Sequence, residues 1–151
     1  MTEASTAQAH LPDGVQSVIN GALTKGLPIT VAHPDPTGAP VMSFRGSVQV
    51  YGPTRLSIWA RNAEGGLAAA AAATAPVALL YRDAAAKTTL NIRGRARLAS
   101  DDTERDQVFE VTPAAEQTKD PDRKGAAIVV DVERVQGMLE GAPVKVVVPG
   151  A

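Results

Sequence analysis

The chain has 151 residues, the usual size of one folded domain, so we expect one domain and not two. It contains no cysteine, which excludes disulfide bonds, a thiolate nucleophile and any metal site with cysteine ligands. Its 15 lysine and arginine residues nearly balance its 16 aspartate and glutamate residues, so the whole-molecule charge attracts neither nucleic acid nor an anionic surface.

Two segments bear on the location of the protein. Residues 1–12 lack the basic and apolar pattern of a secretory signal, and we expect a flexible tail there, before a domain that spans residues 13–151. The most apolar run, residues 67–80, is shorter than the roughly 20 residues that a membrane-spanning helix needs, and Pro76 interrupts it. We therefore expect a cytoplasmic protein without a membrane segment.

The first part of the domain predicts a helix followed by a hairpin. Asp13 and Gln16 have the spacing of a capping box, and apolar residues recur at helical spacing until the chain nears Gly26. The string from His33 to Gly38 is dense in turn-forming residues, so it is expected to connect two strands.

Strict alternation of apolar and polar residues then predicts one long, half-buried strand over residues 42–50. Its apolar face holds Met42, Phe44, Gly46, Val48 and Val50. The alternation resumes over residues 56–61 after a Gly-Pro turn, so these two segments are predicted to pair as an antiparallel hairpin.

Composition and period predict the remaining elements. An alanine-rich helix is expected between Asn62, which is placed to cap it, and Pro76. Asp101 and Glu104 have the spacing of a second capping box, at the start of a polar helix, and residues 112–125 resemble a loop. Further strands are predicted over residues 77–81, 90–98, 128–132 and 144–148.

The hairpin-length connections indicate a mainly β fold with a few short helices. A small closed barrel would remove the exposed sheet edges. Gly46 and Gly94 lie inside predicted strands, where tight curvature or close approach of another backbone favours glycine. We therefore predict a β-barrel.

The strongest candidate site is an anion seat at the ends of two neighbouring strands. Arg45 and Ser47 supply a guanidinium and a hydroxyl from one strand, and Arg61 supplies a second guanidinium from the next. Gly65 and Gly66 then open a helix, whose first N–H groups favour anions. Solvated arginines beside an ordinary glycine turn are the alternative explanation of the same residues.

Trp59 and a row of arginines leave their roles open. Trp59, the only tryptophan, either forms an aromatic wall for a flat ring system or fills a subunit contact. Arg93, Arg95 and Arg97 alternate along one strand and indicate a solvated or ion-paired face, because no aromatic residues interleave with them as in nucleic-acid grooves.

We expect neither a catalytic triad nor a metal site. His10 lies in the expected tail and His33 in a proline-rich turn, and the sequence supplies no partner for either one. The acidic residues at positions 101–106 are explained by the dipole of the helix that they open.

Four strings follow one another along the chain: Ser43-Phe44-Arg45-Gly46-Ser47, Leu56-Ser57-Ile58-Trp59-Ala60-Arg61-Asn62, Pro76-Val77-Ala78-Leu79-Leu80-Tyr81-Arg82-Asp83 and Ile92-Arg93-Gly94-Arg95-Ala96. In their order and spacing they resemble the pyridoxamine 5′-phosphate oxidase-like proteins, which bind flavins in a split β-barrel. The resemblance extends from about Val15 to Val135.

The resemblance implies a homodimer that holds FMN, or alternatively the deazaflavin F420, in a groove between its subunits. The cofactor contacts that it implies within one subunit are Arg45, Gly46, Ser47, Trp59, Ala60, Arg61 and Asn62. It further implies backbone contacts from Gly66 and Leu67, and contacts from Lys87 and Asn91 of the partner subunit.

The function implied by the resemblance is hydride transfer between the cofactor and an unknown small substrate. The alternatives are a non-catalytic protein that stores or senses a flavin or haem, and a barrel kept as a dimeric scaffold. Oxidation of vitamin B6 is not expected, because the chain lacks the substrate-phosphate residues of a genuine pyridoxamine phosphate oxidase.

Overall fold

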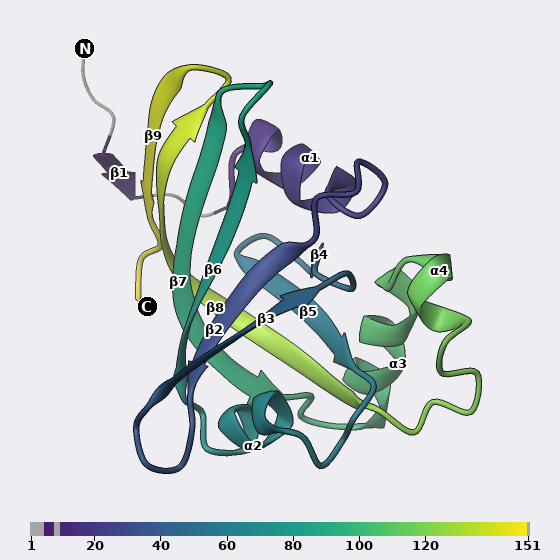
Figure 1. Ribbon diagram of the computed structural model, residues 1–151. Coiled ribbons are helices and arrows are strands. Elements are labelled where there is room, and N and C mark those ends of the chain that lie inside the picture. Colours follow the sequence, from purple (N-terminus) through teal and green to yellow (C-terminus); the bar gives the residue numbers. More distant parts are fainter. Residues whose placement is uncertain (1–4, 8–9, 151) are drawn as a thin grey trace.

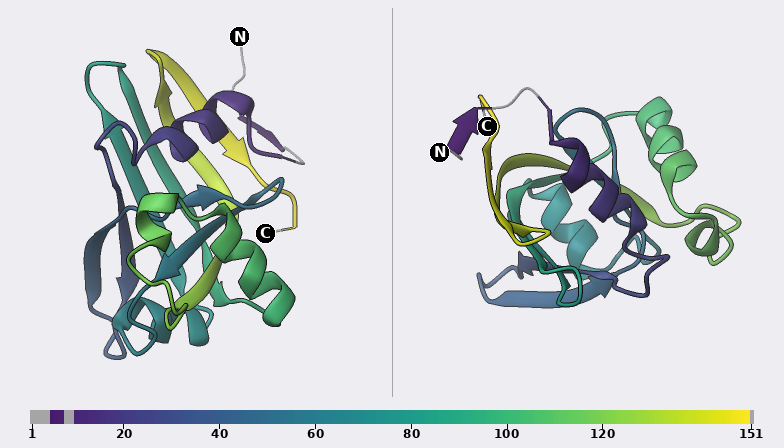
Figure 2. Two further views of the ribbon diagram at one scale, coloured as in Figure 1. Left: turned by 90° about the vertical axis from the view of Figure 1, so that its right-hand side faces the viewer. Right: turned by 90° about the horizontal axis from the view of Figure 1, so that it is seen from above.

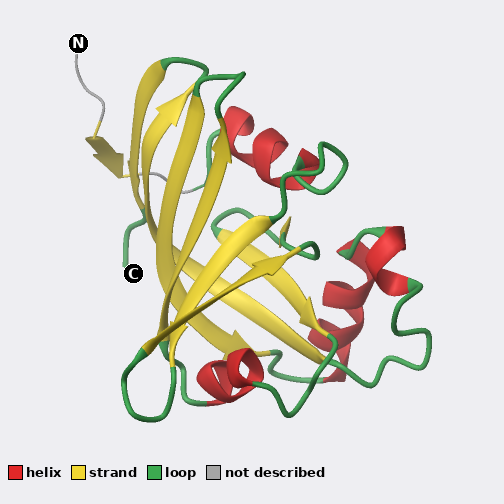
Figure 3. Cartoon of the chain, in the orientation of Figure 1, coloured by secondary structure: helices red, strands yellow, loops and turns green. Residues whose placement is uncertain are grey.

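The computed structural model describes the backbone of residues 5–7 and the whole of residues 10–150 (Figure 1). Strands outnumber helices over these residues, and the helices are short (Figure 3), which confirms the mainly β prediction. The helices are α1 (Asp13–Gly21), α2 (Gly66–Ala72), α3 (Asp102–Val111) and α4 (Ala114–Gln117). The strands are β1 (Ser5–Ala7), β2 (Ile29–Pro34), β3 (Pro40–Arg45), β4 (Gln49–Val50), β5 (Arg55–Ala60), β6 (Pro76–Asp83), β7 (Thr88–Leu98), β8 (Ala126–Leu139) and β9 (Ala142–Val147).

All of these strands belong to one curled sheet, whose main path runs β1, β9, β8, β7, β6, β2, β3. Strand β8 organises it. One side of β8 pairs with β7, while the other side pairs with β5 over residues 126–131 and with β9 over residues 134–139. Because β8 changes partner along its length, the sheet bends around an enclosed interior (Figure 2).

The barrel remains open along β3, which pairs only with β2 among the described strands. The closed, edge-free barrel expected from the sequence is therefore wrong, and the split β-barrel is confirmed. The predicted turn between His33 and Gly38 is confirmed, since β2 and β3 pair in antiparallel register on either side of it.

The interior of the curled sheet holds the main hydrophobic core, where Leu56, Ile92 and Val130 are fully buried. Helix α1 lies across one end of the barrel and adds Val15 and Ile19, both 0% exposed (Figure 2). Burial of each such side chain contributes roughly 1.5–3 kcal/mol to folding. The helical spacing of the apolar residues in α1 is thus explained by its one buried face.

A second, smaller core lies on the outer side of β5, under α3. It contains Trp59, Val108, Phe109, Ala127 and Val129. Strand β5 is therefore covered on both faces, by the main core inside and by α3 outside, and it is buried from Leu56 to Ala60. Because both faces of β5 are packed, the position of its end is fixed, and with it the position of Arg61 and Asn62, which follow.

Only one of the two helices predicted to begin with a capping box has the predicted side-chain cap. At α3 the Glu104 N–H donates to the Asp101 carboxylate at 2.8 Å, which confirms the predicted start of that helix. At α1 the prediction is wrong, because Asp13 lies inside the first turn and its side chain caps nothing. The Gln16 side chain instead donates to the carbonyl oxygen of Leu11 at 2.7 Å.

The long, half-buried strand predicted over residues 42–50 is also wrong. The chain turns at Gly46 and Ser47, which separates β3 from β4. The apolar face of β3 is not covered, since Met42 is 72% and Phe44 is 74% exposed. Alternation shows that one face of a strand is apolar, but it does not show what lies against that face.

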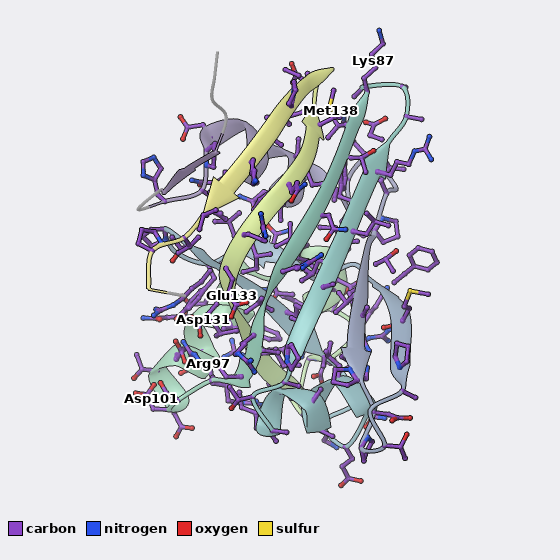
Figure 4. The ribbon with its side chains drawn as sticks, turned by 90° about the vertical axis from the view of Figure 1, so that its left-hand side faces the viewer. Lys87, Arg97, Asp101, Asp131, Glu133 and Met138 are labelled. Atoms are coloured by element: carbon purple, nitrogen blue, oxygen red, sulfur yellow. The ribbon has the colours of Figure 1, made fainter. Side chains whose placement is uncertain are left out.

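Met42 and Phe44 share the outer face of the sheet with Leu80 of β6, which is 45% exposed. Phe44 and Leu80 both stand opposite Thr30 of the intervening strand β2. We call Met42, Phe44 and Leu80 the apolar strip. Figure 4 shows this outer face of the molecule, across which β9, β8, β7 and β6 lie side by side. Exposed apolar side chains gathered in one place mark interaction surfaces.

Part of the segment expected as a tail is tied to the barrel. Residues Ser5–Ala7 form β1, which pairs with β9 in parallel register. Leu11 is fully buried, and its N–H donates to the carbonyl oxygen of Pro53 at 2.7 Å. Residues 1–4 and 8–9 lie outside the described residues, so the flexible tail stays a prediction there.

The acidic start of α3 is anchored to the sheet by Glu104. Its carboxylate accepts hydrogen bonds from the Arg97 guanidinium at 2.7 Å and from the Ser100 N–H at 2.8 Å. The bond from Arg97, foremost, lowers the pKa of Glu104 to about 2. Arg97 also pairs with Asp131, and Asp131 with Arg55, so an ionic network joins α3, β7, β8 and β5.

Replacing Glu104 by glutamine is expected to lower the free energy of unfolding at neutral pH by about 1–2 kcal/mol, because a charge-assisted hydrogen bond is lost. Because folding lowers the pKa of this carboxyl from 4.5, its stabilising effect is present above pH 4.5 and fades as the pH falls towards 2. Urea unfolding across this pH range measures the difference. Asp102→Asn, an exposed change in the same helical turn, is the control and is expected to change stability little. An equal effect of both variants would contradict the assignment.

Candidate functional site

A polar groove of about 760 Å³ lies where β3 and β5 end, beside α4. Six of the residues predicted from the sequence line it: Arg45, Gly46, Ser47, Trp59, Arg61 and Asn62. We call this space the groove. Its size falls within the range of about 300–1,000 Å³ that is typical of small-molecule sites.

The two arginines give the groove its positive charge. Arg45 is half-buried, and its Nε donates to the Ser43 hydroxyl at 3.0 Å, while Arg61 is exposed. Burial, and after it the like charge of Arg61, holds the pKa of the Arg45 guanidinium below its usual value. Over residues 10–150 neither guanidinium is within ion-pair distance of a carboxylate. An anion between them would relieve their mutual repulsion.

Ser47 acts as a structural link beneath the arginines. Its hydroxyl donates to the Trp59 carbonyl oxygen at 3.1 Å and accepts from the Trp59 N–H at 3.0 Å. Ser47 is only 2% exposed, so both of these bonds are sheltered from water. The pair of bonds ties the turn after β3 to β5 and thereby fixes the separation of Arg45 and Arg61.

The ring of Trp59 does not stand open in the groove. Its residue is 3% exposed, and the ring makes an edge-on contact with Phe109 at 4.8 Å between centroids. The Arg105 guanidinium lies 4.7 Å from the ring centroid, and the indole N–H donates to Asp120 at 2.8 Å. The sequence left two roles open for Trp59. Because the ring is buried, it cannot form the aromatic wall of a flat-ring site within one subunit. The exposed aromatic residue of the groove is Phe44.

Asp120 holds the loop that follows α4 against the base of the groove. Besides the indole of Trp59, it accepts hydrogen bonds from the N–H groups of Lys124 at 3.0 Å and Gly125 at 2.8 Å. Burial acts to raise the pKa of Asp120, but these donors outweigh it and lower the pKa below its ordinary value. The carboxylate is thus fully used in structure.

The other residues predicted from β5 and α2 contribute mainly backbone. Ala60 and Leu67 are buried, at 2% and 1% exposure. Asn62 does not cap α2 as predicted, because Gly65 is the capping residue and the Asn62 side chain accepts from the Glu64 N–H at 3.0 Å. Gly66 begins the helix, and a Cβ there would come within 3.2 Å of the His33 ring.

Lys87 and Asn91 lie apart from the groove. Lys87 occupies the turn between β6 and β7, at the far tip of that hairpin (Figure 4), with a positive φ of 52°. Asn91 is exposed on the outer face of β7. The expectation that these residues reach the cofactor of a partner subunit stays a prediction.

The structure adds Glu116 and Lys119 to the groove. They belong to α4 and the turn after it, within the stretch that the sequence predicted as loop, and their side chains pair at 3.0 Å. A Cβ at Gly46 would lie 3.0 Å from the Glu116 carboxylate, so glycine permits this close approach. The signal for α4 was Pro113 followed by two alanines, which suit the first turn of a helix.

No protein-family model matches the sequence, and no curated protein matches it. Solved structures do. A proposed pyridoxamine 5′-phosphate oxidase of Lactobacillus delbrueckii is 18% identical over 85% of this chain and 94% of its own, with a TM-score of 0.57. A Clostridium acetobutylicum protein related to general stress protein 26 of Bacillus subtilis is 12% identical over 89% and 95%, with a TM-score of 0.61. An F420 reductase is 16% identical over 83% and 98%, with a TM-score of 0.55.

The chain has the split β-barrel fold of the pyridoxamine 5′-phosphate oxidase-like proteins. The resemblance read from the four strings is thereby confirmed at the level of the fold. At these identities the comparison fixes the architecture of the split barrel and leaves its chemistry to the residues of the groove.

Among the described residues, no group of three histidine, aspartate or glutamate side chains is arranged to hold a metal ion. In the same part of the chain no helix is long and apolar enough to cross a membrane. His33 is 5% exposed, and its Nδ1 lies 3.1 Å from the carbonyl oxygen of Pro34.

Proposed function

We propose that the protein is an oxidoreductase of the pyridoxamine 5′-phosphate oxidase-like family that uses FMN, or alternatively F420, to exchange hydride with a small substrate in the cytoplasm. The observation that carries this proposal is the pair of uncompensated guanidiniums, Arg45 and Arg61, in a groove of small-molecule size within this fold. Neighbours in the fold include a proposed pyridoxamine 5′-phosphate oxidase and an F420 reductase, which supports a flavin-type ligand.

The groove fits the phosphate end of such a cofactor. Arginine binds phosphate through two parallel N–H···O hydrogen bonds, and two arginines from separate segments can contact one phosphate from two sides. Arg45 is half-buried and already oriented by Ser43, so little side-chain freedom is lost when an anion binds. The Asn62 amide and the N–H of Gly66 are the further donors that we assign to the phosphate and its sugar-alcohol chain. Glu116 and Lys119 also line the groove, and the Glu116 carboxylate lies close to Gly46.

The flat ring of the cofactor requires an apolar surface beyond the arginines. Phe44 lies at the rim of the groove and is 74% exposed, so it is the aromatic side chain available to the ring. When bound, a flavin or deazaflavin supplies hydride transfer at its ring, which requires no acid or base from the protein. The residues of this chain would bind and orient the ring, and exclude water from one of its faces.

A second copy of the chain would supply the missing wall. The apolar strip places Met42, Phe44 and Leu80 together on the outer sheet face, next to the groove. Burial of this strip against its counterpart gives a self-complementary contact of the kind that two-fold dimers use. In such a dimer, Lys87 and Asn91 are the residues that we assign to the cofactor bound by the other copy.

Cofactor titration of the purified protein, followed by fluorescence, tests the proposal. We expect FMN or F420 to bind, and Arg61→Ala to weaken that binding at least about tenfold, because a charge-assisted contact to phosphate is removed. Arg95→Ala removes an exposed arginine from a different face and is expected to leave the affinity unchanged. Binding of neither cofactor, or equal affinity in Arg61→Ala, would contradict the proposal.

Subunit association gives an independent test. We expect the wild-type chain to sediment as a dimer and Met42→Asp to shift it towards monomer, since a charge would be buried in the apolar contact. Cofactor affinity should fall with it, although Met42 does not line the groove. Val111→Asp, at an exposed apolar position on α3, should remain dimeric. A monomeric wild type that binds the cofactor, or a dimeric Met42→Asp, would count against the second wall.

A further inference from the structure

A second polar cavity, of about 190 Å³, lies on the outer face of the sheet between β7 and β8. Four side chains line it: Asn91, Arg93, Arg134 and Gln136. We call these four residues the arginine cluster. Arg93 stands directly opposite Arg134, and Asn91 directly opposite Gln136, so the four form a square across two neighbouring strands.

An irregularity in the sheet brings the two arginines together. The register of β7 and β8 shifts between Arg93 and Gly94, and Gly94 pairs with Val132. If the register of Arg95 and Asp131 continued without this bulge, Arg93 would stand opposite the carboxylate of Glu133. With the bulge, Glu133 is left out of the pairing and Arg93 faces Arg134 instead. Like charges placed directly opposite one another destabilise a sheet. Stability of the fold therefore does not explain why Arg93 faces Arg134.

Nothing within the described residues neutralises the cluster. Arg93 and Arg134 form no ion pair and donate no side-chain hydrogen bond there, and the buried Nε of Arg134 has no partner. The acids nearest along β8 are already paired, Asp131 with Arg55 and Arg97 and Glu133 with Arg95. A buried donor without an acceptor is a costly feature that calls for a missing partner.

A third cation adds to the field. Lys145 of β9 stands directly opposite Gln136 and shares the outer face with it. Cations and amide donors thus lie on the same side of the sheet in two neighbouring rows. One row holds Asn91, Gln136 and Lys145, and the other holds Arg93 and Arg134. These groups match the needs of a small oxyanion, because guanidinium forks bind phosphate or carboxylate oxygens in pairs and amides satisfy the remaining lone pairs.

We propose that the arginine cluster is a second binding site, for the phosphate or carboxylate group of a small molecule. The Nε of Arg134 and the guanidinium of Arg93 bind the oxyanion, and the amide of Gln136 completes its hydrogen bonds. The site is separate from the groove, because β2 and β6 lie between β3 and β7. At about 4.8 Å for each strand step, three steps place the two sites roughly 14 Å apart across the sheet. The inference does not depend on the proposed function.

Titration of the flavin-free protein with inorganic phosphate and, separately, with succinate tests the site, with backbone amide shifts followed by NMR. We expect one or both anions to move the amide signals of residues 91–93 and 134–136, and the affinity to fall as salt is added. Arg134→Gln should weaken binding at least about tenfold. Arg95→Gln, two residues from Arg93 on the same face of β7 but paired with Glu133, should bind as the wild type does.

The Arg61→Ala variant separates this site from the groove. Shifts at residues 91–93 and 134–136 that persist in Arg61→Ala and vanish in Arg134→Gln support the arginine cluster. Shifts that vanish in Arg61→Ala would mean that the anion binds in the groove, and would overturn the inference. Wild-type signals that neither anion moves would overturn it as well. Because Arg93 is exposed, Arg93→Gln provides a second variant in case Arg134→Gln does not fold.

Discussion

The change of partner along β8 is the constraint on which the molecule depends. This strand of 14 residues holds β7 on one side while β9 gives way to β5 on the other. The bend requires the backbones to approach closely at Gly94, where a Cβ would overlap the carbonyl oxygen of Asp131. The result is a barrel that is curled but left open, with the ends of β3 and β5 side by side at the groove.

Both candidate sites follow from that bend. In the groove, the hydrogen bonds between Ser47 and Trp59 hold the turn after β3 against β5, and so bring Arg45 near Arg61. On the outer face, the register shift beside Gly94 brings Arg93 opposite Arg134. In each place two guanidiniums lie together without a carboxylate partner among the described residues. The repulsion between guanidiniums is thus left uncompensated at two positions. Elsewhere Arg97, Arg55 and Arg95 pair with acidic residues.

Local pattern was sufficient to predict most of the elements. Period-two alternation located β5 and β7, and the spacing of Asp101 and Glu104 located the start of α3. The same pattern failed over residues 42–50, because the burial of an apolar face depends on what packs against it, and β3 is an edge strand with an uncovered outer face. The alternation within one strand carries no information about whether another part of the chain, or a second copy of it, covers the apolar face.

The candidate site was predictable where it depends on strand order and not where it depends on packing. Arg45 and Arg61 line the same groove as expected, although β3 and β5 do not pair with each other. The sequence left Trp59 open as a wall of the site, yet the ring belongs to the core under α3, because the side of β5 that α3 covers is a tertiary feature. Glu116 and Lys119 were missed because α4 has only four residues and resembles a loop in sequence. Arg93, together with Arg95 and Arg97, was interpreted as part of a solvated or ion-paired strand face, because the β-bulge that places Arg93 opposite Arg134 leaves no clear mark in sequence.

The central claim is that Arg45 and Arg61 form a seat for the phosphate of a flavin-type cofactor. Riboflavin has the ring and side chain of FMN without its phosphate, so a comparison of the two affinities by fluorescence titration tests that claim directly. The account predicts that FMN binds tighter than riboflavin by on the order of a hundredfold, from two charge-assisted contacts. Equal affinities for FMN and riboflavin would contradict it.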